Sequence, residues 1–466
     1  AFDLLGRPGN LEEAENVIKN AVTLIRENEA DHFKMSKMVL VIDEAQDISE
    51  DEYNLICELI KYNENIKVIA VGDDDQNIYE FRGSSSKYLH EFANNKKYEL
   101  TINYRSKKNI VEYTNKFISE IPFRLKTQAM KSSTNKNGYV KIVTYNTDNI
   151  YIPLIHDVLN RPVGRTAIIT RTNNQAGIIS ALLNDNNIPN RLIQENLEVR
   201  PYNIYELRVF YQIIENFVQT KIPYEIYVNA LNEFKNKFAK SANYELYRKV
   251  LEKFLDLYED MYLTDLKEYL SEISLSSFFD EEKLIVANLH KVKGMQFDNV
   301  YLLYDNNIQI KYEDIRAIYV GMTRAKNYLS IHTNNEIFKN IHIKDIEYKE
   351  EKNEYPIPNT LEIICTLKDV NLGSYDSLNF DLTQILPGTP IILQDDKILS
   401  YKQHNKLHKV GTLSTSCTKQ IQELQKENYQ IVKSCVDNLI YWYDRENRKE
   451  VLVMTPRFKL RYNDNK

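Results

Sequence analysis

The first residues whose types and spacing suggest chemistry are two acidic side chains that follow an apolar run. Val41-Ile42 leads directly into Asp43 and Glu44. A buried strand that ends in this pair suits phosphoryl transfer: Asp43 would hold Mg²⁺ through water, and Glu44 would polarise the attacking water. Taken alone, an acidic turn between strand and loop is an equally good interpretation.

A second candidate segment, Gly72–Ser84, follows another apolar run. Gln76 could sense a γ-phosphate or orient the attacking water. Tyr79 and Phe81 offer ring faces for stacked bases, worth about 1–3 kcal/mol per base, and Arg82 adds a partner for phosphate. The competing interpretation is that these aromatic rings belong to a hydrophobic core.

The elements that must position these residues form a strand–helix–strand pattern typical of an α/β sheet. Apolar runs at 38–42 and 66–71 predict buried strands, and 50–62 predicts the helix between them. Ligands of such sheets bind at the carboxyl ends of the strands, where both acidic segments lie. Similar apolar runs predict strands at 166–170, 284–287 and 300–303, and a helix ending near 184. Helical spacing continues over 200–280. The last hundred residues show short alternating runs and a helix near 419–428.

Size and composition narrow the class of protein. A chain of 466 residues with 43% hydrophobic and 27% charged side chains is typical of a multidomain globular protein. The net charge of −6 argues against nucleic-acid binding through bulk charge, so a DNA site would be a local groove. Four cysteines without C-x-x-C spacing argue against disulfide and zinc frameworks and favour a reducing, cytoplasmic location. No signal peptide or membrane-length apolar run is evident, so we expect no membrane partner.

The acidic segments together resemble motifs II and III of the UvrD/Rep family of superfamily 1 DNA helicases. Three later segments resemble further motifs of this family in the family's order. These are Leu100–Ser106 for motif IV, Ala287–Asp298 for motif V and Tyr319–Lys326 for motif VI. A single match would be weak, but an ordered set is specific.

The resemblance implies roles for the nucleotide side of the site. Tyr104 would stack on adenine, and Arg105 and Arg324 would be arginine fingers on the γ-phosphate. A surface salt bridge is the alternative interpretation of either arginine alone. Catalysis would thus use Asp43, Glu44, Gln76, Arg105 and Arg324 with ATP and Mg²⁺ as cofactors.

Motif V would connect nucleotide and DNA. The resemblance implies that Asn288, His290 and Lys293 face single-stranded or partial duplex DNA, and that Gly294 and Gln296 serve the nucleotide side. A structural histidine is the alternative interpretation of His290. The family usually has Thr at position 288 and Glu at position 296, so Gln296 lacks a charge that relatives use.

We therefore expect an α/β fold with RecA-like P-loop NTPase motor lobes, of which the first is incomplete. The expected domains are 1–105 (part of the first lobe), 106–336 (the second lobe with a helical insertion at about 200–280), 337–355 (a linker) and 356–466 (a small β-rich accessory domain). None of the 12 glycines is followed by lysine, so G-x-x-x-x-G-K-[ST] is absent. We expect an upstream segment or another chain to supply this loop and cover the incomplete lobe.

The expected function is ATP-driven helicase or translocase activity on single-stranded DNA, 3′ to 5′ as in the family. The chain alone would be inactive as an ATPase. The alternative is a non-catalytic nucleic-acid-binding or scaffold module of a larger fusion helicase, although such a module needs none of the catalytic residues. A helicase–nuclease is a third interpretation, but 356–466 holds no convincing carboxylate cluster followed by lysine.

Overall fold

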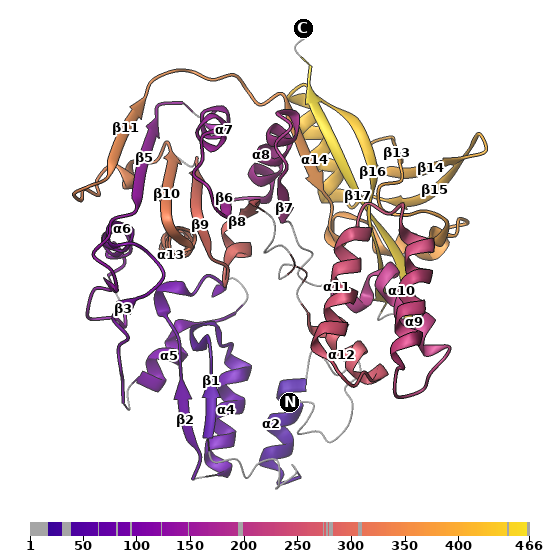
Figure 1. The fold of residues 1–466 in the computed structure, drawn as a ribbon, viewed down its shortest axis with the longest axis horizontal. Coiled ribbons are helices and arrows are strands. Elements are labelled where there is room, and N and C mark those ends of the chain that lie inside the picture. The colour runs from indigo at the N-terminus through magenta and orange to yellow at the C-terminus, as the bar shows by residue number, and fades with distance from the viewer. Residues whose placement is uncertain are drawn as a thin grey trace. The chain divides into compact units, whose positions relative to one another are not determined.

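The computed structural model describes residues 17–29, 39–63, 65–80, 83–93, 96–122, 124–147, 149–193, 199–273, 275, 278, 283–305, 310–444 and 447–463. The chain forms two compact units, each assembled from two stretches of sequence (Figure 1). The first unit comprises 1–148 and 292–352, and the second comprises 149–291 and 353–466.

The first unit contains the strand–helix–strand pattern that the sequence predicts. β1 (Val39–Ile42) pairs in parallel with β2 (Lys67–Ala70), and α4 (Glu50–Tyr62) lies between them in the chain. The helix begins at a capping box in which Ser49 and Glu52 bond to each other's backbone N–H, which satisfies donors that the first turn leaves open. α2 (Val17–Arg26) packs on α4 through Ile25, and α5 (Ser86–Ala93) contributes to the core beside β1.

Among the described residues, only one face of the β1–β2 pair is covered. Its inward side chains, among them Leu40 and Ala70, pack against the core built by α4 and α5. The opposite face exposes four apolar side chains: Val39 (51%), Val41 (62%), Ile69 (51%) and Val71 (47%). Contiguous exposed apolar surface on a sheet usually marks an interaction site.

The rest of the first unit is a parallel α/β arrangement. β5 (Tyr139–Tyr145), β9 (Phe297–Tyr304) and β10 (Ala325–Thr333) are buried, and β11 (Glu347–Glu351) pairs with β5 at the edge. The helices are α6 (Lys108–Ile118) and α13 (Tyr312–Met322), and β3 (Ile102–Asn103) pairs with β4 (Lys131–Ser132).

β11 differs from the linker expected over 337–355. Its sequence is charged because an edge strand is held by main-chain pairing and can expose its side chains to water. The sequence pattern of an exposed edge strand therefore looks like that of a linker.

The second unit begins with a parallel group of strands. β8 (Leu284–Asn288) pairs with β6 (Thr166–Thr170) and with β7 (Arg191–Ile193). α7 (Tyr151–Leu159) precedes β6, and α8 (Asn173–Asp185) follows it. β6 and β8 are buried along their whole length, which is why their sequences are continuously apolar.

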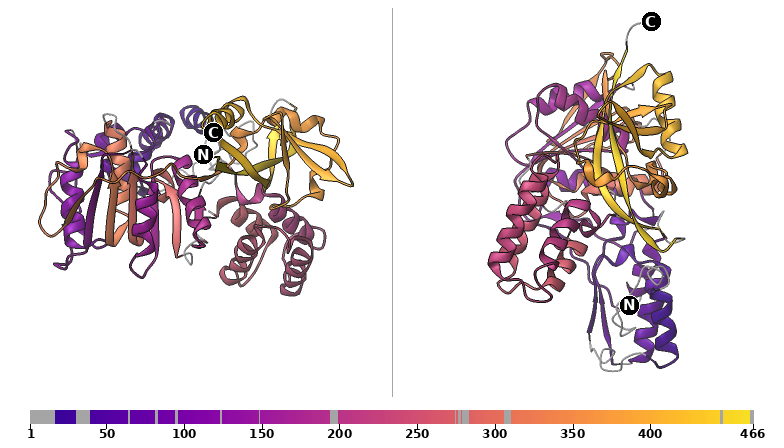
Figure 2. Two further views of the ribbon diagram at one scale, coloured as in Figure 1. Left: turned by 90° about the horizontal axis from the view of Figure 1, so that it is seen from above. Right: turned by 90° about the vertical axis from the view of Figure 1, so that its right-hand side faces the viewer.

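Four helices and the C-terminal strands share one hydrophobic core in the second unit. The helices are α9 (Tyr205–Glu215), α10 (Tyr224–Phe238), α11 (Tyr244–Leu257) and α12 (Leu263–Glu272). The C-terminal elements are β12 (Thr360–Ile364), β13 (Ile392–Gln394), β14 (Ile398–Gln403), β15 (Lys406–Thr412), α14 (Thr415–Lys426), β16 (Tyr429–Asp444) and β17 (Lys449–Tyr462). Figure 2 shows these helices beside the yellow hairpin of β16 and β17 in both views.

This shared core differs from the expected separation of a helical insertion from an accessory domain at 356–466. Neither set of elements buries its apolar face alone, so they pack on each other. The C-terminal basic run is also strand rather than solvated tail: Arg457 pairs with Asp437, and Lys459 pairs with Asp185. Within the described part of the chain, no helix has the length and apolar character needed to cross a membrane.

Candidate nucleotide-hydrolysis site

The carboxyl ends of β1 and β2 lie side by side in the first unit. Ile42 is in register with Ala70, and backbone bonds of 2.8 and 2.9 Å join Ile42 and Ala45 to Val71. Asp43 and Glu44 therefore follow β1 at the edge where the Gly72 segment follows β2. Both carboxylates are exposed, and Glu44 has a left-handed backbone (φ 48°), a strained conformation typical of functional turns.

Gln46 joins the two strand ends. It is fully buried; its Nε2 donates to Glu44 Oε2, and its Oε1 accepts from the backbone N–H of Asp73 at 2.9 Å. A Cβ at position 72 would lie 2.6 Å from Gln46 Oε1, so this close approach requires Gly72. Glu44 is thus held by a residue that also fixes the start of the next loop.

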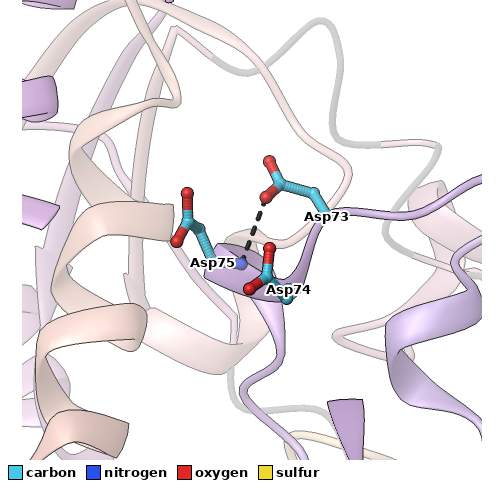
Figure 3. A group of neighbouring side chains, drawn as sticks. All are labelled: Asp73, Asp74 and Asp75. Carbon is cyan, nitrogen blue, oxygen red and sulfur yellow. Dashed lines mark hydrogen bonds between the residues drawn. The ribbon is translucent and has the colours of Figure 1, made fainter. Parts of the chain in front are cut away.

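Asp73, Asp74 and Asp75 form an acidic turn after β2 (Figure 3). Asp73 Oδ1 accepts from the N–H of Asp75 at 3.1 Å and so caps the turn. Their carboxylates lie within 4.8 Å of one another, but basic groups already pair with Asp73 and Asp75, and Asp74 accepts from the N–H of Leu125 at 2.7 Å. Arg124 donates twice to Asp75 at 2.6 Å, and Lys126 reaches Asp73 at 2.6 Å. The turn is therefore an ion-pair network that anchors residues 124–126.

Gln76 lies between this turn and motif VI. Its Nε2 donates to Asp73 Oδ2 at 2.8 Å, and its Oε1 accepts from Arg324 Nη2 at 3.0 Å. Arg324 is only 3% exposed and also donates from Nε to the Val320 carbonyl at 2.8 Å. Two residues that lie 248 positions apart in sequence are thereby in direct contact.

Arg105 lies beside Arg324. The Asn103 side chain accepts from the N–H groups of Arg105 and Ser106, and Ser106 donates to the Ala325 carbonyl at 2.6 Å. Arg105 itself donates to the Thr323 carbonyl at 3.1 Å. The loop after β3 is therefore fixed to the start of β10.

The two guanidinium groups lie close together, and the carboxylates of Glu44 and Asp73 attract Arg324 only from beyond ion-pair distance. Burial, followed by the neighbouring Arg105, lowers the pKa of Arg324 to about 10, and burial also lowers the pKa of Arg105. Among the residues that the structure describes, both arginines donate to carbonyl or amide oxygens and neither forms an ion pair, and Arg105 Nε is buried without a hydrogen-bond partner. Such a pair is suited to a multiply charged anion.

Lys293 contacts the acidic side of the site. Its ammonium group donates to Asp47 Oδ2, lies 3.7 Å from Glu44 Oε2, and sits 5.1 Å from the centre of the Tyr79 ring. Burial raises the pKa of Asp47 in spite of this contact. The motif V lysine, expected on DNA, is thus bonded to motif II in the structure.

The other expected nucleotide residues lie in the first unit. Tyr104 is 81% exposed, so its ring is available for stacking. Gly294 has φ +83°, a conformation that favours glycine, and Gln296 is exposed. Phe81 and Arg82 lie outside the described residues.

Asn288 and His290 belong to the second unit. Asn288 donates to Asn173 Oδ1 at 2.7 Å and accepts from the N–H of Lys291 at 3.1 Å. Its side chain therefore joins β8 to the start of α8. The Nδ1 atom of His290 is buried.

Three residues of the site were not predicted from the sequence: Gln46, Arg124 and Lys126. The signal for Gln46 was present, because a glutamine between Glu44 and Asp47 at a strand end must bond to something once buried. Arg124 and Lys126 carried no local signal, since their partners lie 49 and 53 positions away.

The parallel strands, the acidic strand ends and the two neighbouring arginines fit a RecA-like helicase fold. Family models match most of this region: the UvrD/REP helicase N-terminal domain at residues 8–97, and the UvrD-like helicase C-terminal domain at 98–217 and 194–336. The second model alone covers more than half of the chain.

Curated relatives agree with this match. The ATP-dependent DNA helicase Rep of Buchnera aphidicola is 21% identical over 77% of this chain and 56% of its own length. DNA helicase IV of Escherichia coli is 35% identical over 28% of this chain and 20% of its own length. The Gabija protein GajB of Bacillus cereus is 28% identical over 66% of this chain and 67% of its own length.

The chain belongs to the UvrD/Rep-like family of superfamily 1 DNA helicases. It spans little more than half of the Buchnera Rep sequence and a fifth of DNA helicase IV.

Proposed function

We propose that this chain carries most of the catalytic groups of a motor that hydrolyses Mg²⁺–ATP and moves 3′ to 5′ along single-stranded DNA. The observation that carries this proposal is the pairing of the half-buried Arg105 with the buried Arg324 beside Gln76, where no carboxylate among the described residues lies within ion-pair distance of either guanidinium group. A γ-phosphate supplies the negative charge that this pair lacks. The description of Rep as an ATP-dependent DNA helicase is consistent with this chemistry.

Each catalytic residue has a distinct role in this proposal. Glu44 orients and deprotonates the attacking water, and Gln76 senses the presence of the γ-phosphate. Arg105 and Arg324 stabilise the charge on the equatorial oxygens during transfer. An exposed carboxylate at a strand end fits Mg²⁺, which prefers few protein ligands, so Asp43 would hold the ion through water. When bound, the ion neutralises charge on the phosphate oxygens.

The remaining nucleotide contacts would come from Tyr104, Gly294 and Gln296. Tyr104 would stack on adenine, and the left-handed Gly294 lets the backbone approach the nucleotide closely.

The strand would be bound by Tyr79, Phe81, Arg82, Asn288, His290 and Lys293. In this role Lys293 exchanges Asp47 for a DNA phosphate, which would couple strand binding to the residues around Glu44.

The phosphate-binding loop would come from a segment outside these 466 residues or from another chain. The exposed valines and isoleucine of β1 and β2 support this part of the proposal, since they form an apolar sheet face beside the acidic strand ends. An added α/β element would cover this face and bring backbone N–H groups to the phosphates.

The test is ATP hydrolysis stimulated by single-stranded DNA. This chain is compared with a form that also carries a phosphate-binding-loop segment. We expect activity only in the extended form, and Glu44→Gln should lower its kcat by roughly a hundredfold or more. Glu50→Gln, which neutralises an exposed carboxylate on α4, is the matched control.

Absence of ATPase activity in the extended form, with DNA binding retained, would contradict the proposal. That outcome would instead indicate a non-catalytic nucleic-acid-binding module.

A further inference from the structure

A continuous hydrogen-bond chain joins the two sides of the candidate site. Glu44 accepts from Gln46, Gln46 accepts from the Asp73 N–H, the Asp73 carboxylate accepts from Gln76, and Gln76 accepts from Arg324. Asp73 is the central residue of these hydrogen bonds, because its backbone N–H donates to Gln46 and its carboxylate accepts from Gln76.

The direction of each bond follows from the chemistry of the fixed groups. The Asp73 carboxylate can only accept when ionised, and the Arg324 guanidinium can only donate. Between them, the Gln76 amide has one allowed orientation, with Nε2 toward Asp73 and Oε1 toward Arg324. A neutral or displaced group at Asp73 would remove this constraint and let the amide rotate.

Lys126 holds the Asp73 carboxylate in its position. Its Nζ lies 2.6 Å from Asp73 Oδ2, the same oxygen that accepts from Gln76, and 3.3 Å from Asp75 Oδ2. Both side chains are largely buried, at 17% and 22% exposed, so solvent screens this contact only weakly. Burial opposes the charge on Lys126, but the carboxylates of Asp73 and Asp75 outweigh it and raise the pKa of the lysine.

We propose that Lys126 is a positioning residue: through Asp73 it fixes the amide of Gln76 and thereby the place of the Arg324 guanidinium. The inference rests on the proposed function, because it assumes that Gln76 and Arg324 act on the γ-phosphate. Lys126 itself touches no reacting group.

The test is Lys126→Met in the protein supplied with its phosphate-binding loop. We expect kcat for DNA-stimulated ATP hydrolysis to fall roughly tenfold while KM for ATP changes by less than about threefold, because the residue shapes the transition-state contacts. Lys126→Arg should retain most of the activity, since it keeps a cation beside Asp73.

A second background separates positioning from folding. In a Gln76→Ala protein, Lys126→Met should lower kcat no further, because the residue through which it acts is gone. Lys97→Met is the matched control: Lys97 holds the carbonyl of Leu125 at 2.8 Å, on the same segment, and no described bond connects it to Asp73. It should leave kcat close to that of the parent protein.

An equal loss of kcat from Lys126→Met with and without Gln76, or an equal loss of kcat from Lys97→Met, would overturn the inference while leaving the proposed function intact.

If the parent protein itself hydrolyses no ATP, the proposed function fails. The inference is then tested on the Gln76 side-chain amide by NMR of ¹⁵N-glutamine-labelled protein. A shift of this resonance on Lys126→Met supports the fixed orientation, and an unchanged resonance overturns it.

Discussion

At the scale of single residues, the site has an acidic side at Glu44 and Asp47 and a basic side at Arg105 and Arg324. Lys293 lies against Asp47 and near Glu44, whereas Arg105 and Arg324 lie together with no carboxylate of the described residues within ion-pair distance. One Asp47 oxygen is buried without a hydrogen-bond partner, so the acidic side is not fully satisfied by Lys293 alone. Both sides therefore gain from ligands of opposite charge.

Lys293 provides a test at this scale. If it exchanges Asp47 for a DNA phosphate, Lys293→Met should lower the slope of log Kobs against log salt concentration for single-stranded DNA by about 0.7. The measurement is a titration of fluorescent DNA at several salt concentrations.

Lys291→Met, which removes a neighbouring lysine of motif V, shows whether a slope change is specific to position 293. An unchanged slope for Lys293→Met would assign the lysine to the acidic cluster alone.

At the scale of elements, helix α9 carries a buried carboxylate into the core that it shares with the C-terminal strands. Glu206 is 0% exposed and accepts from Ser241 Oγ at 2.6 Å, while its second oxygen is buried without a hydrogen-bond partner. Burial raises the pKa of Glu206 from its ordinary 4.5 to about 7. The protonated form is therefore favoured by the packing of α9.

The sign of the resulting pH dependence follows from linkage. Between pH 4.5 and 7 the folded state binds more protons at Glu206 than the unfolded state does, so the free energy of unfolding falls as pH rises. The stabilisation is complete below pH 4.5 and is lost through pH 7, with a size of roughly 3 kcal/mol.

Glu206→Gln should remove this component and make the protein more stable than the parent at pH 8. Urea unfolding at pH 5, 6, 7 and 8 measures the effect. Glu233→Gln, an exposed position on α10, is the control and should keep the parent's pH dependence. Parallel pH profiles for Glu206→Gln and the parent would show that Glu206 does not titrate in this range.

At the scale of the whole molecule, the described structure leaves one apolar sheet face open. Val39, Val41, Ile69 and Val71 lie on the side of β1 and β2 that faces away from α4 and α5. Exposed side chains of this size cost little in the chain alone but stabilise an assembly once covered. This face is therefore where a phosphate-binding-loop element would bind in the proposed motor.

Val41→Lys tests this assignment. It should leave the melting temperature of the chain almost unchanged, since the side chain is 62% exposed, and should abolish ATPase activity when the loop-bearing element is supplied. Val432→Lys replaces an exposed valine of β16 and should affect neither measurement. Full ATPase activity in Val41→Lys would exclude this face as the binding site.

Several local elements could be predicted because their signals are local. The helix at Glu50–Tyr62 and the strand at Thr166–Thr170 were expected with these bounds, and the structure confirms them. A capping box begins the helix, and a continuous apolar run with polar flanks marks a strand that is buried on both faces. The edge strand Glu347–Glu351 was missed, because main-chain pairing leaves no apolar pattern in its side chains.

The family, the order of its motifs and the residue types available for phosphoryl transfer can be read from the sequence, because each is encoded in a short segment. Which of these residues are in contact depends on the folded structure. Gln76 contacts Arg324, Lys126 contacts Asp73, and the four helices pack on the C-terminal strands through contacts distant in sequence. Such contacts are set by the packing of whole elements, which no window of sequence contains.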